Sequence, residues 1–228
     1  MNSGDALLLP IAFAVVSSAF GEAAPAEALQ PPPLYRQLRY DEDYRYLRDP
    51  ARRTDFLDPI KYIPLTESGA SYLTLGGEIR ERYEYFRNPI WGAAPQDNDG
   101  YWLERYMLHA DAHIADFFRA FVQFKSGLET GRRGGPRPTD RDEADLHQAF
   151  FDMRVALADT NAFTLRLGRQ ELAYGSSRLI SFRESPNVRL SFDGAKAFWQ
   201  MDQTRIDAFA LKPVETKPGV FDDGPGRT

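Results

Sequence analysis

The stretch SYLTLGGEIRERYEYFR, residues 71–87, decides the fold class, because apolar and charged residues alternate along it. Its apolar set is Leu73, Leu75, Ile79, Tyr83 and Tyr85. Its polar set is Thr74, Glu78, Arg80, Arg82 and Glu84. Successive side chains of a β-strand point to opposite sides of the sheet. The stretch therefore predicts a strand with one apolar face and one densely charged face.

The same alternation recurs in six later segments. They are residues 101–114, 117–127, 146–157, 162–172, 188–201 and 204–212. A strand that crosses a bilayer needs about 9–11 residues, with an apolar outward face and aromatic residues near its ends. The seven segments therefore predict an all-β fold, part of an antiparallel transmembrane β-barrel. Within 188–201 the apolar phase shifts after Gly194, which predicts a β-bulge there.

The connections between these segments alternate between long and short. Residues 88–100, 129–145 and 174–187 form long connections, whereas Ala115–Asp116, 158–161 and Asp202–Gln203 form short ones. Outer-membrane barrels have long loops on the outer side and tight turns on the periplasmic side. The alternation therefore favours such a barrel.

One part of the chain also fits an amphipathic helix. At 100° per residue, Ile114, Phe117, Phe121 and Phe124 cluster on one side of residues 109–125. Short apolar runs often fit both periods. The flanking segments fit only the strand period, so we interpret this region as two strands joined by a turn.

Composition narrows the class of protein. The chain has 228 residues, no cysteine and a formal net charge of -5. The lack of cysteine excludes a disulfide framework, and the negative charge argues against a nucleic-acid partner. Aromatic residues make up 13% of the chain although the mean hydropathy is -0.49. This combination is typical of a sheet that lies between two different environments.

The first 70 residues differ from the rest. Leu7–Phe20 is an apolar run, too short to span a bilayer, and small residues follow it. This predicts a secretory signal over residues 1–28, cleaved between Gly21 and Ala28, although the first five residues include no lysine or arginine. Residues 29–70 mix both charge signs without a period. They predict an irregular periplasmic lead-in with one helical turn around Asp55–Lys61.

Two parts of the chain resemble a known family. The run LRLGRQELAYGSSRLISFRESPNVRLSFDGAKAFW, residues 165–199, resembles the alginate-export domain of Gram-negative outer-membrane proteins. So do LDPIKYIPL, residues 57–65, and YLTLGGEIRERYEYF, residues 72–86. The resemblance implies a monomeric barrel in outer-membrane lipid, which lets the anionic polysaccharide alginate leave the periplasm and works with a periplasmic secretion complex. Barrels of this family have more than seven strands, so we expect the barrel domain, residues 71–228, to be incomplete at its C-terminus.

The polar face supplies the candidate site. Arginines fall opposite the apolar set in most strands: Arg80, Arg82, Arg105, Arg119, Arg154, Arg166 and Arg189. By resemblance, Arg169 and Arg183 join them. Acidic residues on the same face would reduce the positive electrostatic potential of these arginines, and they include Glu78, Asp152 and Asp193. Arginine offers planar, paired donors to carboxylates, so the set predicts a path for a polyuronate. The alternative is that these charges pair across strands and fill a wet interior.

Other chemistry has weaker support. His109 and His113 would lie about 13 Å apart on a strand, too far to share one zinc ion with Asp111. The pairs Glu78 with Glu84 and Asp152 with Asp193 could serve glycoside hydrolysis, but such pairs are common in an acidic chain. No nucleophile, phosphate-loop or dinucleotide motif is present in the sequence. We therefore predict no metal, no cofactor and no enzymatic activity.

Three functions remain open. The first is a channel for passive export of an anionic polysaccharide such as alginate. The second is a general porin for other small or anionic solutes. The third is a periplasmic carbohydrate-binding β protein, in which the apolar face would be a protein core. The many tryptophan and tyrosine residues near strand ends favour contact with lipid.

Overall fold

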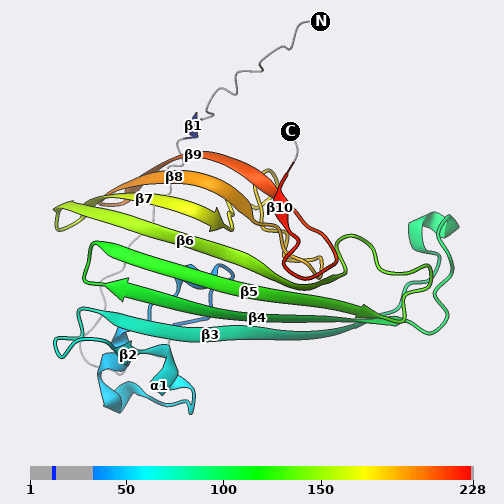
Figure 1. Ribbon diagram of the computed structural model, residues 1–228, viewed down its shortest axis with the longest axis horizontal. Helices are drawn as coiled ribbons and strands as arrows, with labels where there is room; N and C mark the ends of the chain where they lie inside the picture. Colours follow the sequence, from blue (N-terminus) through cyan, green and yellow to red (C-terminus); the bar gives the residue numbers. More distant parts are fainter. Residues whose placement is uncertain (1–11, 14–32, 227–228) are drawn as a thin grey trace, which may run out of the picture.

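The computed structural model describes residues 12–13 and 33–226, and most of them belong to one antiparallel sheet. Its seven long strands are β3 (Tyr72–Glu84), β4 (Tyr101–Ile114), β5 (Phe118–Thr130), β6 (Asp142–Ala158), β7 (Asn161–Gln170), β8 (Phe192–Met201) and β9 (Thr204–Glu215) (Figure 1). Each pairs with the next along the chain. The predicted all-β fold is confirmed, and the sheet is consistent with part of a β-barrel.

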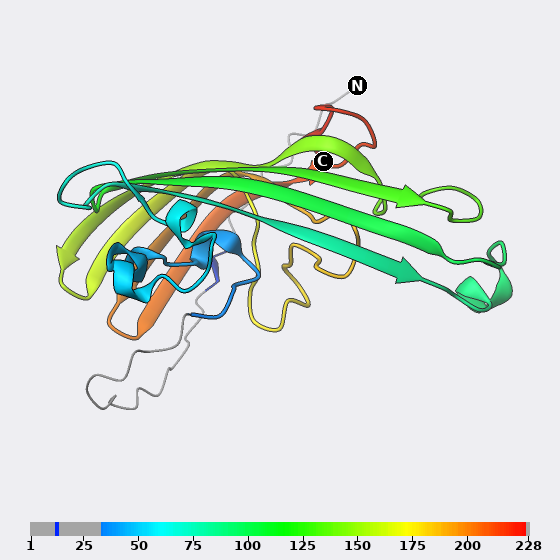
Figure 2. The same cartoon turned by 90° about the horizontal axis from the view of Figure 1, so that it is seen from below.

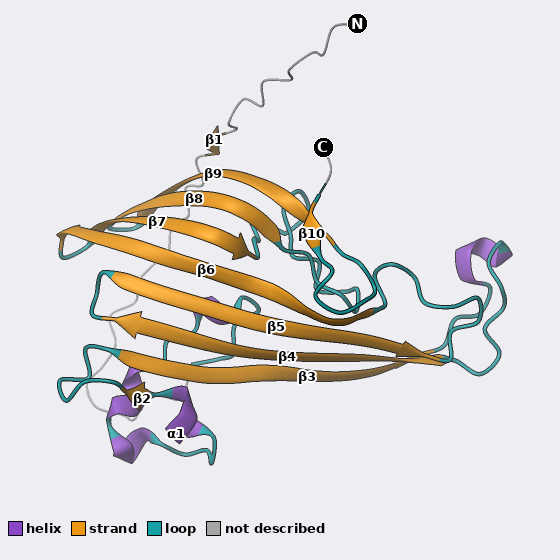
Figure 3. Ribbon diagram, viewed as in Figure 1, coloured by secondary structure: helices purple, strands orange, loops and turns teal. Residues whose placement is uncertain are grey.

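The shorter elements lie around this sheet. Strand β1 (Ala12–Phe13) and β10 (Gly224–Pro225) pair with β9, and β2 (Ile63–Pro64) pairs with β3. Figure 3 shows the few helices: η1 (Arg39–Asp41), η2 (Arg45–Arg48), η3 (Pro50–Arg52), α1 (Asp58–Lys61) and η4 (Pro89–Gly92). Helix α1 falls inside the predicted helical turn. Apart from β1, the predicted signal lies outside the described residues.

Within the described ranges, no helix is both long and apolar enough to cross a membrane.

The connections confirm the predicted alternation. Tight turns join β4 to β5, β6 to β7 and β8 to β9 at one end of the sheet, and the long connections gather at the other end (Figure 1). Residues 109–125 form strand, turn and strand, with Ile114 opposite Phe118. The helical alternative is therefore wrong. Both strands of this segment form backbone hydrogen bonds with a neighbouring strand on each edge. These hydrogen bonds outweigh the helical period of the local sequence.

The two faces of the sheet meet different surroundings. Apolar side chains on one face are exposed, among them Ile79, Leu108, Phe124, Val155 and Trp199. We call this the outer face. The opposite, inner face carries most of the charges, and residues 33–62 together with the connection 171–191 pack against it (Figure 2). Buried residues therefore lie between the inner face and these two segments.

A β-bulge in β6 breaks the simple alternation. Gln123 in β5 pairs with Gln148, but the next residue, Phe124, pairs with Leu146. His147 is left without a partner on β5, and both His147 and Gln148 contact Glu171 on the inner side. The extra residue thus turns two consecutive side chains inward, which a strict period of two does not predict.

The predicted bulge at Gly194 is wrong. The register continues through Gly194, which lies opposite Gly168. Both glycines have positive φ, 145° and 126°, and a Cβ at Gly168 would lie 2.2 Å from the carbonyl oxygen of Ala149. The positive φ at both positions is a backbone conformation that glycine adopts without strain and without an additional residue.

We predict that Gly168→Ala destabilises the protein by about 1–3 kcal/mol, the usual cost of a residue held in such a backbone region. Gly224→Ala is the matched control, because a Cβ there would meet nothing within 4 Å. It should change the free energy of unfolding by less than about 0.5 kcal/mol. Urea unfolding in detergent micelles measures both. Equal effects of the two substitutions would contradict the proposed role of the glycine pair.

Candidate functional site

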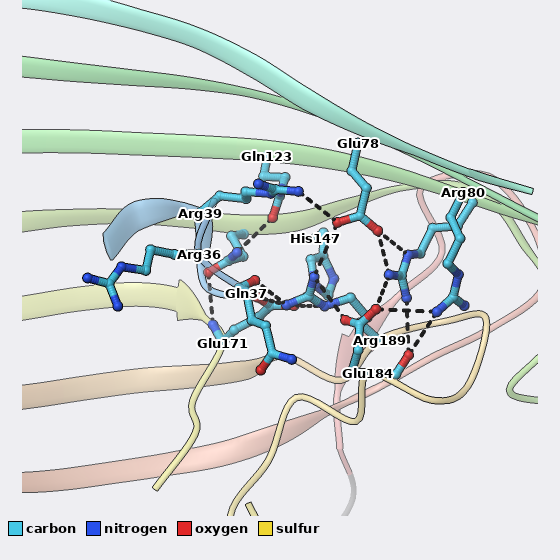
Figure 4. Close-up of polar contacts among 12 residues, drawn as sticks. Arg36, Gln37, Arg39, Glu78, Arg80, Gln123, His147, Glu171, Glu184 and Arg189 are labelled. Carbon is cyan, nitrogen blue, oxygen red and sulfur yellow. Dashed lines mark hydrogen bonds and ion pairs between the residues drawn. The ribbon is translucent and has the colours of Figure 1, made fainter. Parts of the chain in front are cut away.

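The centre of the inner face holds a network of arginines and glutamates. The side chain of Arg105 is only 2% exposed, and its Nε donates to Oε1 of Glu78 at 2.9 Å. Arg105 also pairs with Glu184, which comes from the connection after β7. Arg80 lies 3.3 Å from the same carboxylate (Figure 4). Glu184 is thus shared between arginines of neighbouring strands.

A second group adjoins this network. Arg189 donates from Nη2 to Oε2 of Glu171 at 2.9 Å, and His147 Nε2 lies 2.7 Å from the other oxygen of that carboxylate. Arg189 also lies 3.3 Å from Glu184, which joins the two groups (Figure 4). All three side chains of this second group are nearly inaccessible to solvent. Burial of so many charges is tolerated because each has an opposite partner.

Residues 174–187 were predicted as a long outer loop, but the connection spans 171–191 and folds onto the inner face, and we call it the inward loop. Residues 171–172 and 188–191, predicted as strand, belong to this loop because they turn away from the sheet to contact the inner face. The inward loop contributes Glu171, Glu184 and Arg189 to the network. The amide nitrogen of its Asn187 lies 2.9–3.0 Å from the carbonyl oxygens of Glu104, Leu128 and Asp140. These contacts fix the loop against the sheet. Sequence reasoning did not select Glu171 or Glu184, although both lie in the family-like run. Glu184 lies in a predicted loop, where a period of two gives no direction, and Glu171 lies at the end of a predicted strand that in the structure already ends at Gln170.

The lead-in segment also covers the inner face. The hydroxyl of Tyr40 donates to the carbonyl oxygen of Glu171 at 2.8 Å, and burial raises the pKa of this hydroxyl above its usual range. Arg39 lies 3.3 Å from Glu78, and the carbonyl oxygen of Gln37 accepts from Arg189 at 2.8 Å (Figure 4). Residues 37–40 are therefore tied to the same arginines and glutamates as the inward loop.

Toward the tight-turn end, the inner face encloses an open cavity of about 810 Å³. Arg166 and Asp152 pair there at 2.7 Å, and Lys196 lies 3.1 Å from Asp207. Arg154 also lines the cavity, and its side chain makes no ion pair with any described residue. It is the most available cation on this part of the inner face.

The cavity is electrically balanced. Its cationic side chains are Arg45, Arg119, Arg154, Arg166, Lys196 and Arg205. Its carboxylates are Asp41, Glu42, Asp43, Asp116, Asp152 and Asp207. Six positive and six negative charges give a net formal charge of zero with His113 neutral. The arginines are thus mostly compensated, as the alternative interpretation of the sequence anticipated.

The structure brings most predicted site residues together on the inner face. These are Glu78, Arg80, Arg82, Arg105, Arg119, Asp152, Arg154, Arg166 and Arg189. Arg183 lies exposed in the inward loop. Arg169 and Asp193 lie opposite each other and pair at 2.8 Å, and Arg169 lies opposite Ala149, which places both on the outer side of the sheet. Asp193 differs from expectation because β8 begins only at Phe192 and keeps one phase through Gly194.

One group of carboxylates among the described residues is close enough to hold a metal ion. It comprises Asp142, Asp145 and Asp223, whose oxygens lie within 4.8 Å of one another. Lys125 Nζ lies 2.6 Å from Asp142 and 2.8 Å from Asp223, so an ammonium group already supplies positive charge there. The two strand histidines lie elsewhere: His109 stacks on Phe121, and His113 stacks on Tyr72.

Comparison with known proteins identifies the family. The family model described as alginate export matches residues 71–225, which include all seven long strands and the inward loop. The chain belongs to the alginate export family. Proteins of this family are outer-membrane transport proteins and not enzymes. Searches of curated proteins and of solved structures give no match. The resemblance of residues 72–86 and 165–199 to alginate-export domains is thus confirmed, whereas the match does not extend to residues 57–65.

In this alginate-export domain, we predict that Arg105→Ala lowers the free energy of unfolding by about 1.5–3 kcal/mol, because it removes the buried guanidinium that hydrogen-bonds both Glu78 and Glu184, while Arg39 still lies 3.3 Å from Glu78. Arg82→Ala is the control. Arg82 pairs with Glu84, but its side chain is 29% exposed, so its loss should cost less than about 1 kcal/mol. Denaturant unfolding in micelles compares the two. A loss at Arg105 no larger than that at Arg82 would show that the network does not stabilise the fold.

Proposed function

We propose that this protein forms part of an outer-membrane channel through which an anionic polysaccharide such as alginate leaves the periplasm passively, along the arginine-rich inner face. The observation that carries the proposal is the division of the sheet. Strand after strand presents arginine to one side and exposed apolar residues to the other. Membership of the alginate export family supports the choice of cargo.

The outer face suits lipid better than water. Ile79 is 75% exposed and Leu108 is 66% exposed, and each buried methylene group contributes about 0.8 kcal/mol. Tyr83 and Trp102 pack together near the loop end, where an aromatic girdle would meet the lipid headgroups. A soluble carbohydrate-binding protein would instead need to cover this face with its own core. Outer-membrane localisation is therefore part of the proposal.

The inner face suits a polyanion that must pass without being trapped. Conduction requires binding that is weak enough to release the cargo. Most arginines here already have a carboxylate partner, so a uronate group would exchange with an internal carboxylate. Arg154, which makes no ion pair with a described residue, would meet the uronate group directly. Glu184, which is 38% exposed and contacts three arginines, is the residue best placed for such an exchange. Because each such exchange replaces one carboxylate partner of an arginine by another, the net binding free energy per contact stays small.

Conductance in planar bilayers tests this function. We expect anion-selective currents that alginate oligomers block, and Arg154→Gln should weaken the block about two- to fivefold, since an exposed charge pair contributes about 0.5–1 kcal/mol. Arg87→Gln, an exposed arginine of the 85–100 connection, is the control and should leave the block unchanged.

Two results would speak against the proposal. Currents that alginate oligomers do not block would favour a general porin. A protein that stays soluble and monomeric without detergent and carries no current would overturn the channel altogether.

A further inference from the structure

Two residues expected on the polysaccharide path, Arg169 and Asp193, lie on the outer face of the sheet instead. Nε and Nη2 of Arg169 donate to the two carboxylate oxygens of Asp193, at 2.8 Å and 3.1 Å. Lys212 of β9 lies directly opposite Asp193, and residues paired in this way point to the same side of a sheet. The three residues form one row across the neighbouring strands β7, β8 and β9 (Figure 1). We call it the outer charged row.

Three apolar rows precede the outer charged row on the same face. Counted from the tight-turn end, they are Phe163, Trp199 and Ile206; then Leu165, Ala197 and Ala208; and then Leu167, Ala195 and Ala210. On all three strands, the first charged residue of this face therefore appears in the same row. A charge on the lipid side of a barrel is costly at the middle of the bilayer and costs little near its boundaries. The outer charged row therefore marks a boundary of the membrane.

The length of this apolar band agrees with a bilayer. Eight residue steps separate Arg169 from Asn161 at the tight-turn end of β7, which is about 27 Å along the strand. With a tilt of about 40°, this length spans about 20 Å of membrane, close to the apolar band of about 25 Å in outer-membrane barrels. At the tight-turn end of the band, Trp199 Nε1 donates to Oδ1 of Asn161 at 2.6 Å. Tryptophan with an apolar body and a hydrogen-bonded N–H is typical of a membrane interface.

The outer charged row includes one cation without an internal partner. The side chain of Arg169 is only 14% exposed, and its Nη1 donates to the carbonyl oxygen of Leu146 at 3.0 Å, so this carbonyl and Asp193 satisfy it. Lys212 is exposed, and its ammonium group forms no ion pair with any residue that the structure describes. Two cations and one carboxylate leave the row with a net positive charge, and its available donor is Lys212.

The opposite side of the sheet carries negative charge at its loop end. There the outer face presents Glu81 and Glu104, which lie opposite each other in β3 and β4. The hydroxyl of Tyr106 donates to Glu81 at 2.7 Å, which keeps this carboxylate at the surface of the sheet. Two carboxylates repel an anionic headgroup. An anionic lipid therefore suits the β7–β9 side of the outer face and does not suit the β3–β4 side.

We propose that the outer charged row is a binding site for an anionic lipid of the outer leaflet, with the lipid phosphate at Lys212 and the acyl chains over the three apolar rows. The inference rests on the outer-membrane location within the proposed function, and it adds a lipid partner. It also gives Arg169 and Asp193 a role outside the polysaccharide path, because their ion pair lies at the level of the lipid headgroups.

The lipid preference can be measured on the full chain in phosphatidylcholine vesicles. A fluorophore on Ala210→Cys, one row from Lys212, is the only cysteine label, because the natural chain contains no cysteine. We expect admixed brominated phosphatidylglycerol to reach this label with about fivefold preference over brominated phosphatidylcholine, the gain expected from one basic side chain near an anionic headgroup. Lys212→Gln should remove the preference, and Lys212→Arg, the matched control that keeps the charge, should retain it.

A second label, on Leu108→Cys, reports the side of the sheet that carries Glu81 and Glu104, and it should show no preference for brominated phosphatidylglycerol. Equal quenching of the Ala210→Cys label by the two lipids, or a preference that Lys212→Gln leaves intact, would overturn the lipid site while the export function stands. If neither brominated lipid quenches either label, the outer face does not meet lipid. The lipid site then falls together with the proposed membrane location.

Discussion

The structure depends on one constraint: a strand must offer its alternate side chains to two different media while its backbone pairs on both edges. An apolar outer face then forces the charges to the inner face, where many are shielded from water. An unpaired buried charge costs several kcal/mol, so each must find an opposite partner on a neighbouring strand or segment. Arg166 with Asp152 and Lys196 with Asp207 meet this requirement across strand pairs. In the network around Arg105, one of the opposite charges is Glu184 of the inward loop.

This need for compensation also explains the two segments that fold over the inner face. The inward loop brings Glu184 to Arg80 and Arg105 of the strands, and the lead-in brings backbone carbonyl oxygens to Arg119 and Arg189. Each segment supplies acceptors that the strands do not. In the proposed export function, the carboxylates of a polyuronate would take the place of these acceptors at the same arginines.

The sequence predicted what depends on local period, and it did not predict what depends on distant contacts. All seven long strands and the alternation of loops follow from a period of two and from turn spacing. The inward phenylalanines were hidden, because Phe121 and Phe150 fall on the charged side of their strands. The bond between Tyr40 and Glu171 joins residues 131 positions apart, and no local pattern encodes it. Asp193 was placed on the inner face because the phase of β8 was extrapolated from the loop before it, whereas Arg169 was added by resemblance to the family alone.

The two-sided sheet is the central claim, and single-cysteine labelling along β4 tests it most directly, since the natural chain contains no cysteine. Fluorophores would be attached in turn at the six consecutive positions 106–111 of the protein in lipid vesicles. Brominated lipids should quench the labels at Tyr106, Leu108 and Ala110, but not those at Met107, His109 and Asp111. Quenching that shows no alternation, or alternation of the opposite phase, would contradict the assignment of the outer face to lipid and of the inner face to the cargo.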